Sequence, residues 1–205
     1  MLGLPSYDKK EDDYKDLDRS VSISEAAADG GVCYMIHGNV LPTPKLVKAI
    51  KKLENGEFLS VKGREGIVFR FTQNEIKEQH KIRVKKAVTI REEVTVIQFP
   101  WNIFQLNDQA IRQDFEWLTK KRKSQPVSKT NRVSRSSDIF IEKGAKVEHS
   151  ILNASTGPIY IGKNAEVMEG CMIRGPFAMG EGSLLKMGTK VYGATTLGPS
   201  CIGGG

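Results

Sequence analysis

The stretch that decides the fold is IYIGKNAEVMEGCMIRGPFAMGEGSLLKMGTKVYGATTLGP, residues 159–199. An aliphatic residue or methionine recurs in it at every sixth position: Ile161, Val167, Ile173, Met179, Leu185, Val191 and Leu197. Four residues after each stands a second series, which is small except for Phe177: Ala165, Cys171, Phe177, Ser183, Thr189, Thr195 and Cys201. A β-sandwich would show a period of two without a fixed six. A repeat of six is instead typical of a solenoid.

The six-residue period has a simple geometric interpretation. A chain that turns by about 120° every six residues closes a triangular coil, and stacked coils bury each other's cores. The aliphatic residue points into the prism, and the small residue fits the tight corner, so Cys171 and Cys201 are predicted to be corner residues rather than ligands or nucleophiles. IFIEKGAKV at 139–147 matches IYIGKNAEV at 159–167 with a shift of 20 residues. Twenty is two more than a coil of 18, so we expect extra residues to bulge near 155–158.

The half of the chain before the repeat mixes strand and helix patterns. Apolar, β-branched runs predict strands at 32–40, 57–61, 66–72 and 92–99. Helical spacing of apolar residues predicts helices at 42–53 and 107–122, the second with Asn107 or Asp108 as a cap. Such alternation indicates an α/β layer. We therefore predict an acidic peripheral segment at 1–30 and a partial α/β domain at 31–117.

Positive charge is concentrated between the two halves. The chain has 31 basic and 24 acidic residues, a net charge of +7. Within 118–138, LTKKRKSQPVSKTNRVSRSSD, seven bases accompany one acid. This strip is either a binding surface for nucleic acid, acidic lipid or a phosphorylated ligand, or a solvated linker. Interleaved Ser, Pro, Thr and Asn, and the absence of aromatic residues for base stacking, favour a basic linker at 118–138 and disfavour nucleic acid.

Composition restricts the class of protein. With 39% hydrophobic and 27% charged residues, the 205-residue chain resembles soluble globular proteins. It contains no apolar run long enough for a transmembrane helix, and its acidic N-terminus lacks the apolar region of a signal peptide. Three widely spaced cysteines do not make a disulfide framework. These features predict a cytoplasmic protein that does not contact a membrane.

Several segments carry a resemblance to a known family. They are HGNVLPTPKLVKAI (37–50), PWNIFQLNDQAIRQDF (100–115), LTKKRKSQPVSKTN (118–131), the run from Ile139 to Ala178, and KVYGATTLGP (190–199). Together they resemble the sugar-1-phosphate nucleotidyltransferases with a hexapeptide-repeat tail. Within that family they are most similar to the bifunctional uridyltransferase/acetyltransferases that make UDP-N-acetylglucosamine, especially their divergent Bacteroidetes-type relatives. The resemblance implies that 139–205 form a left-handed parallel β-helix, truncated at its C-terminus, and that the chain forms a homotrimer.

The resemblance also implies a reaction and a set of site residues. Such enzymes couple a nucleoside triphosphate to a sugar 1-phosphate, release pyrophosphate, and supply nucleotide sugars for cell-envelope polysaccharides. Mg²⁺ neutralises the triphosphate and the leaving group. A Gly-Asp-Val-Pro-like family motif corresponds to residues 38–42, and a Val-Asn-like motif to Leu106 and Asn107. This implies metal-ligand roles for Asn39 and Asn107 and a substrate-binding role for Gly38. A turn before Pro42 is the alternative role for Asn39, and a helix cap is the alternative for Asn107.

Departures from the family pattern define the remaining expectations. Asn39 replaces the family's acid, and no Gly-rich phosphate loop with a basic residue precedes it. Glu181 and Pro199 replace the sugar-phosphate-binding Arg and Lys of the acetyltransferases. We therefore expect the chain to be a fragment that is inactive alone, from an enzyme whose catalytic residues are not identified. The alternatives are a non-catalytic trimeric assembly or regulatory subunit, and a hexapeptide acyltransferase.

Overall fold

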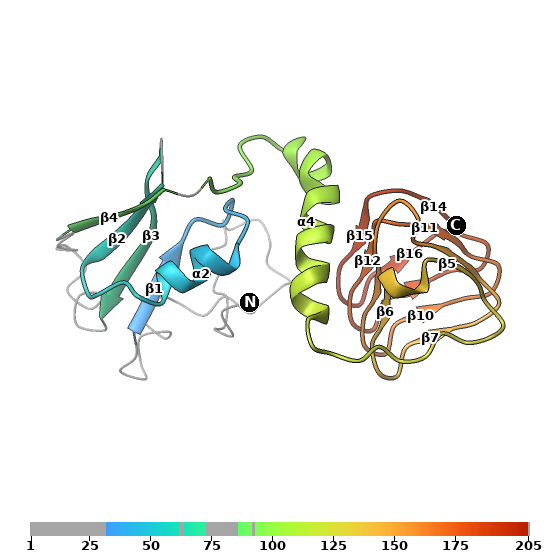
Figure 1. The fold of residues 1–205 in the computed structure, drawn as a ribbon. Helices are drawn as coiled ribbons and strands as arrows, with labels where there is room; N and C mark the ends of the chain where they lie inside the picture. Colours follow the sequence, from blue (N-terminus) through green and yellow to red (C-terminus); the bar gives the residue numbers. More distant parts are fainter. Residues whose placement is uncertain (1–31, 62–63, 73–85, 92, 205) are drawn as a thin grey trace, which may run out of the picture. The chain divides into compact units, whose positions relative to one another are not determined.

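The computed structural model describes residues 32–61, 64–72, 86–91 and 93–204. The chain divides into two compact units, 1–98 and 99–205. The predicted acidic segment at 1–30 lies outside the described residues. Figure 1 labels the elements of both units where there is room.

The first unit is a small mixed sheet with one helix. Its strands, in the spatial order β1-β3-β2-β4, are β1 (Val32–Ile36), β3 (Arg64–Thr72), β2 (Glu57–Val61) and β4 (Lys86–Ile90). β3 is antiparallel to β1 and β2, whereas β4 is parallel to β2. Helix α2 (Pro44–Ile50) begins after Thr43, whose side chain accepts a hydrogen bond from the Leu46 amide at 3.1 Å. Leu46 and Ile50 are buried in the same core as the sheet residues Leu59 and Val68.

Two expected elements in the N-terminal half differ from the structure. The predicted strand at 92–99 is wrong: among 93–98, only Val96 forms a β-bridge, with Val40. The fourth strand is instead β4, which sequence patterns did not separate from its surroundings. The predicted start of the second helix is also wrong, because α4 (Asn102–Thr119) begins five residues earlier. Its first turn exposes Ile103 and Phe104, which breaks the amphipathic pattern from which the start was predicted.

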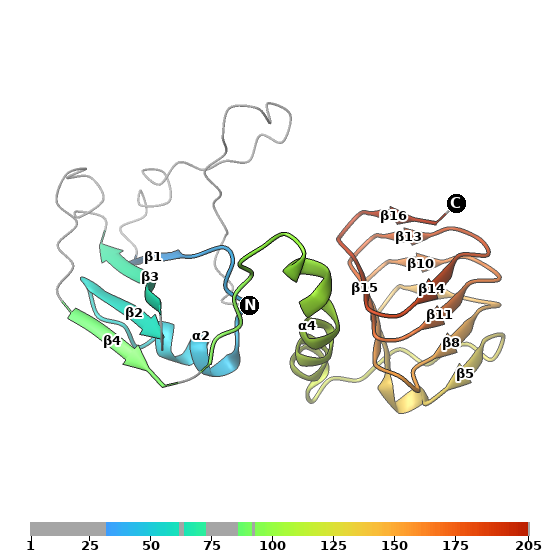
Figure 2. The same cartoon turned by 90° about the horizontal axis from the view of Figure 1, so that it is seen from above.

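The second unit contains a parallel β-helix with three faces, and the predicted fold class is confirmed. Face 1 consists of β5 (Arg132–Ser134), β8 (Ile151–Asn153), β11 (Met172–Arg174) and β14 (Lys190–Tyr192). Face 2 consists of β6 (Ile139–Ile141), β9 (Ile159–Ile161), β12 (Phe177–Met179) and β15 (Thr195–Leu197). Face 3 consists of β7 (Lys146–Val147), β10 (Glu166–Val167), β13 (Leu184–Leu185) and β16 (Ile202–Gly203). A short 3-10 helix, Ser136–Asp138, joins β5 to β6. Figure 2 shows the coils stacked along one axis.

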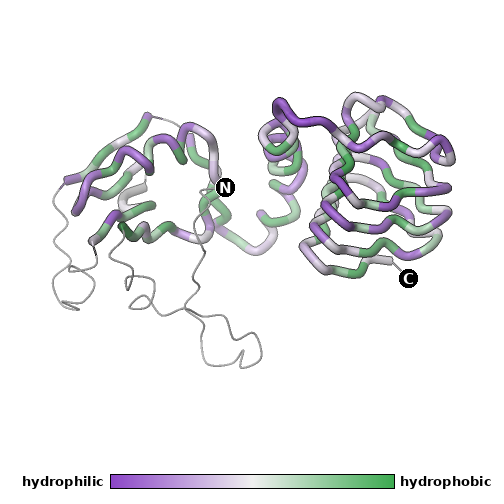
Figure 3. Tube along the Cα trace, turned by 90° about the horizontal axis from the view of Figure 1, so that it is seen from below, coloured by the Kyte–Doolittle hydropathy of each residue, from purple (hydrophilic) through white to green (hydrophobic). Residues whose placement is uncertain are grey.

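The six-residue repeat forms the core of this β-helix, as predicted. Its aliphatic residues are buried from Ile161 to Val191, with Ile161 fully inaccessible and Val191 9% exposed. Hydrophobic and hydrophilic residues alternate along the stacked coils in Figure 3. Cys171 is fully buried, and its pKa is raised by burial, in agreement with a structural corner residue. All described β-helix pairings are parallel, so each inward side chain stacks on its counterpart one coil along.

The predicted bulge is also present. Ile139 pairs with Ile159, a shift of 20, whereas Phe177 pairs with Thr195, a shift of 18. Between β8 and β9 the chain has residues 154–158, but between β11 and β12 only Gly175 and Pro176. The extra residues therefore lie at the corner between faces 1 and 2.

Part of the basic strip forms the start of the β-helix. The Gln125 amide donates to the carbonyl of Ile141 at 2.8 Å, and its side chain donates to the carbonyl of Ala145 at 2.9 Å. The Asn131 side chain donates to the carbonyl of Val147 at 2.7 Å, and Arg132 begins β5. The segment expected to be a linker therefore also contributes a partial first coil.

Two corresponding glycines on neighbouring coils of the β-helix, Gly180 and Gly198, differ in the room they leave for a side chain. A Cβ on Gly180 would lie 2.5 Å from the backbone nitrogen of Pro199, whereas a Cβ on Gly198 would meet only Cys201 Sγ, at 3.5 Å. We expect Gly180→Ala to lower the free energy of unfolding by about 1–3 kcal/mol, because the backbone of the next coil must shift. Gly198→Ala is the matched control, and urea unfolding measures both. Equal stability of the two variants would contradict the close approach of Gly180 to the backbone of Pro199.

Candidate functional site

Gly38 and Asn39 lie in the loop that follows β1. The Asn39 carbonyl accepts a hydrogen bond from the Ile97 amide at 2.7 Å, and Asn39 Nδ2 donates to the Ile97 carbonyl at 3.0 Å. Gly38 is exposed, and no atom lies within 4 Å of the position that a Cβ would occupy. Asn39 therefore holds this loop to Ile97 through two hydrogen bonds. The backbone at Gly38 is accessible, because no neighbouring atom covers it.

Asn107 lies in the interior of α4, where both ends of its amide contact face 2. Its Nδ2 donates to the carbonyl of Ala194 at 3.1 Å, and its Oδ1 accepts from Thr196 Oγ at 2.8 Å. The alternative role as a helix cap is wrong, because α4 begins at Asn102. In the structure Asn107 attaches α4 to β15.

These two amides do not by themselves complete a magnesium site. Asn39 and Asn107 belong to different units, and Asn107 Oδ1 already accepts one hydrogen bond. No group of three or more His, Cys, Asp or Glu residues that could hold a metal occurs in the described part of the chain. Mg²⁺ prefers octahedral oxygen coordination with carboxylates or phosphates. The described residues therefore do not fit a complete magnesium site.

Further contacts hold α4 against face 2. Ile111 is buried at 4% exposure, and Arg112 donates through Nη2 to the carbonyl of Thr156 at 2.6 Å. Asp108 orients that guanidinium through a contact of 2.6 Å to Arg112 Nε. Thr156 belongs to the bulge between β8 and β9. The i, i+4 spacing of Asp108 and Arg112 indicates in the sequence that these two side chains pair. Nothing in the sequence indicates that Arg112 also contacts Thr156.

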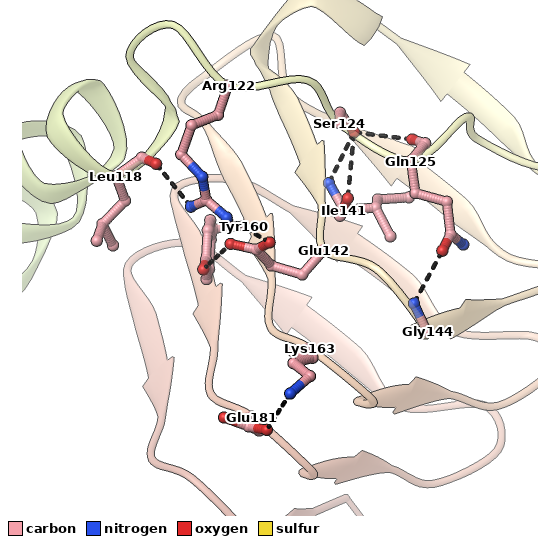
Figure 4. A network of polar contacts seen from close by, with 10 residues as sticks. All are labelled: Leu118, Arg122, Ser124, Gln125, Ile141, Glu142, Gly144, Tyr160, Lys163 and Glu181. Atoms are coloured by element: carbon pink, nitrogen blue, oxygen red, sulfur yellow. Dashed lines mark hydrogen bonds and ion pairs between the residues drawn. The ribbon is translucent and has the colours of Figure 1, made fainter.

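The end of α4 is joined to face 2 by a polar network (Figure 4). Arg122 Nη2 lies 2.7 Å from Glu142 Oε2, and Tyr160 OH donates to Glu142 Oε1 at 2.6 Å. The Arg122 guanidinium also lies 5.2 Å from the ring centroid of Phe140, a cation–π distance, and Phe140 stacks on Tyr160. Sequence reasoning assigned Arg122 to a solvated basic strip and missed this network, whose members are 18–20 residues apart.

The network shifts the acidity of its members in opposite directions. Burial, together with the hydrogen bond to Glu142 and its negative charge, raises the pKa of Tyr160 to about 12. Burial alone raises the pKa of Glu142, but the hydrogen bonds from Tyr160 and Arg122 outweigh it, so that the pKa of Glu142 lies below its ordinary value. Tyr160 therefore stays neutral and Glu142 ionised at neutral pH.

This arrangement predicts a pH-dependent contribution to stability. Because the folded-state pKa of Glu142 is lowered, its contribution is present above its ordinary pKa of 4.5 and is lost as the pH falls through the folded value. We expect Glu142→Gln to cost about 1–2 kcal/mol at pH 7, since a charged acceptor is lost, and much less in acid. Glu181→Gln, in an exposed ion pair with Lys163 at 3.5 Å, is the control. A cost for Glu142→Gln that is constant from pH 7 to pH 3, measured by urea unfolding, would contradict the prediction.

Comparison with known proteins identifies the family. A family model described as sugar nucleotidyl transferase matches residues 17–123, more than half of the chain. The chain belongs to the sugar nucleotidyltransferase family. The resemblance is thereby confirmed at the level of the family. No curated protein matches this sugar nucleotidyltransferase. None of its helices in the described ranges is long and apolar enough to cross a membrane.

The family match includes both predicted ligands and the whole of α4. It ends at residue 123, just before Ser124 and Gln125 contact the first coil. In this sugar nucleotidyltransferase, the last helix of the family segment thus packs on the β-helix. Asn107, Arg112 and Arg122 all belong to the matched segment and make that contact.

Proposed function

We propose that this sugar nucleotidyltransferase forms a UDP-N-acetylglucosamine-like nucleotide sugar from a nucleoside triphosphate and a sugar 1-phosphate, releasing pyrophosphate. The match to the sugar nucleotidyltransferase model over 17–123 is the observation that carries the proposal. Two of the five segments that carry the resemblance to the uridyltransferases, residues 37–50 and 100–115, lie within that match. The uridine base, the N-acetylglucosamine moiety and the use in cell-envelope polysaccharide rest on the resemblance.

The proposal assigns simple roles to the candidate residues. Gly38 would let a substrate approach the loop backbone closely, since it is exposed and has open space beside its Cα. The resemblance assigns Mg²⁺ to Asn39 and to Asn107, and each residue, taken by itself, would offer one amide oxygen. A metal at either residue would need further oxygen ligands, such as substrate phosphates. When bound, the metal would supply charge neutralisation of the triphosphate.

A pyrophosphate-release assay tests the proposal. The protein expressed from its complete reading frame is incubated with each of the common nucleoside triphosphates and a panel of sugar 1-phosphates. We expect turnover to be fastest with UTP and N-acetylglucosamine 1-phosphate, and to stop on chelation of Mg²⁺ with EDTA. Turnover that is fastest with another pair would contradict the proposed substrates. No turnover with any pair would favour the non-catalytic assembly or regulatory subunit.

We also propose that the chain forms a homotrimer in the cytoplasm. A β-helix is compatible with self-association because its faces are flat sheets, and α4 covers one of the three. No disulfide joins the cysteines at 33, 171 and 201, which suits a reducing compartment. Light scattering after size-exclusion chromatography tests the assembly: a monomer at micromolar concentration would contradict the trimer.

A further inference from the structure

Face 1 of the β-helix has a concentration of positive charge that no other described face shares. Three cations, Arg132, Arg174 and Lys190, stand at its outward positions, and these strand positions carry no carboxylate. Arg132, Arg174 and Lys190 form no ion pair with another residue in the described ranges. On face 3, by contrast, Lys146 stands beside Glu166 in the pairing register. Face 1 is therefore suited to an external anion.

The same face also exposes apolar side chains. Ile151 is 40% exposed, Met172 47% and Tyr192 84%. The parallel register places Met172 between Ile151 and Lys190, and Arg174 between Asn153 and Tyr192. Neighbouring strands lie about 4.8 Å apart. One small ligand could therefore contact the cations, the ring of Tyr192 and the exposed apolar side chains at the same time.

A groove runs between these side chains. It has a volume of about 260 Å³ and is lined by Ile151, Asn153, Met172, Arg174, Lys190 and Tyr192. This volume lies just below the roughly 300 Å³ at which small-molecule sites usually start, so a ligand in the groove would be only partly enclosed. Asn153 Oδ1 accepts the amide of Ser155 at 2.9 Å, which leaves its NH₂ group to donate to a ligand.

We propose that this groove on face 1 binds a nucleoside phosphate. Arg174 and Lys190 contact the phosphate, because a guanidinium fork and an ammonium are the side chains that bind phosphate oxygens most strongly. Tyr192 offers its exposed ring to the base, and Asn153 donates to the sugar or base. The choice of a nucleoside phosphate among anions rests on the proposed function, since nucleotides are the substrates and products of such an enzyme. The site lies outside the segment of the family match.

Photo-crosslinking with 5-iodouridine 5′-monophosphate tests this site in the full chain. At low ionic strength we expect a crosslink at Tyr192, mapped by mass spectrometry and displaced by UMP. The double variant Arg174→Gln/Lys190→Gln should raise the half-saturating probe concentration about tenfold or more, because charge-assisted hydrogen bonds to phosphate are lost. The matched control is Lys163→Gln, which removes an exposed cation that pairs with Glu181, and it should leave crosslinking at Tyr192 unchanged.

The outcomes separate this inference from the proposed function. Crosslinks confined to 17–123 would overturn the groove site and leave the nucleotidyl transfer proposal standing. A crosslink at Tyr192 without pyrophosphate release would support the groove and contradict the enzyme. Displacement by inorganic phosphate as effective as by UMP would overturn the assignment to a nucleoside phosphate. Loss of the Tyr192 crosslink as protein concentration rises would overturn it in favour of a second copy of this chain on face 1.

Discussion

Replacing Phe177 by alanine is expected to lower the free energy of unfolding of the β-helix by about 3–5 kcal/mol, the range for deletion of a fully buried aromatic ring. Phe177 is completely inaccessible and belongs to the same core as Ile159, Met179 and Leu185. It occupies a position of the repeat where the other members are small, so a large void would remain. Urea unfolding followed by circular dichroism measures the effect.

A matched exposed variant makes this expectation specific. Met187 is 65% exposed in the same part of the β-helix, so Met187→Ala should change stability by less than about 0.5 kcal/mol. Similar losses for the two variants would show that the six-residue repeat does not direct Phe177 into the core.

The second large effect is expected from Asn107. Its amide makes two hydrogen bonds to β15 and the residue before it, so Asn107→Ala leaves a carbonyl and a hydroxyl without their partners. We expect a loss of about 1–3 kcal/mol in the docking of α4, seen as faster amide hydrogen exchange across residues 107–118. Asn107→Asp should be nearly as costly, since a carboxylate accepts from Thr196 but cannot donate to Ala194.

Thr196→Val separates the docking role of Asn107 from the proposed metal role. It removes the hydroxyl that donates to Asn107 and leaves the amide oxygen in place. If Asn107 only docks the helix, both substitutions should accelerate exchange in α4 and lower pyrophosphate release in parallel. If it also binds Mg²⁺, Asn107→Ala should lower turnover far more than Thr196→Val. Unchanged exchange in both variants would contradict the docking itself.

The β-helix could be predicted almost completely, because its core residues repeat at a short, regular interval in the sequence. Residues such as Ile173 and Leu185 recur every six positions, and each is buried. The bulge was visible as a shift of 20 between two similar segments. The first unit was harder, because short apolar runs such as 92–99 fit a strand by composition, yet only Val96 forms a bridge.

The candidate site could be predicted only as far as local motifs reach. Asn39 and Asn107 could be named from short motifs, but their partners Ile97, Ala194 and Thr196 are 58 to 89 residues away in the sequence. No local sequence pattern indicates which residues so far apart in the sequence will contact each other. The same holds for Arg122, which composition assigned to a solvated strip and which the structure pairs with Glu142.

By itself the sequence determined that this protein carries a parallel β-helix after an α/β region, since a strict period of six leaves the chain few other ways to bury its aliphatic residues. Only the tertiary structure decided that α4 packs on face 2, that part of the basic strip forms the first coil, and that Arg174, Lys190 and Tyr192 share one groove. The physical reason is the range of the interactions. The period of six is carried by residues that are close together in the sequence. Side-chain hydrogen bonds and shared faces join residues that are far apart in the sequence, so they depend on how the coils stack.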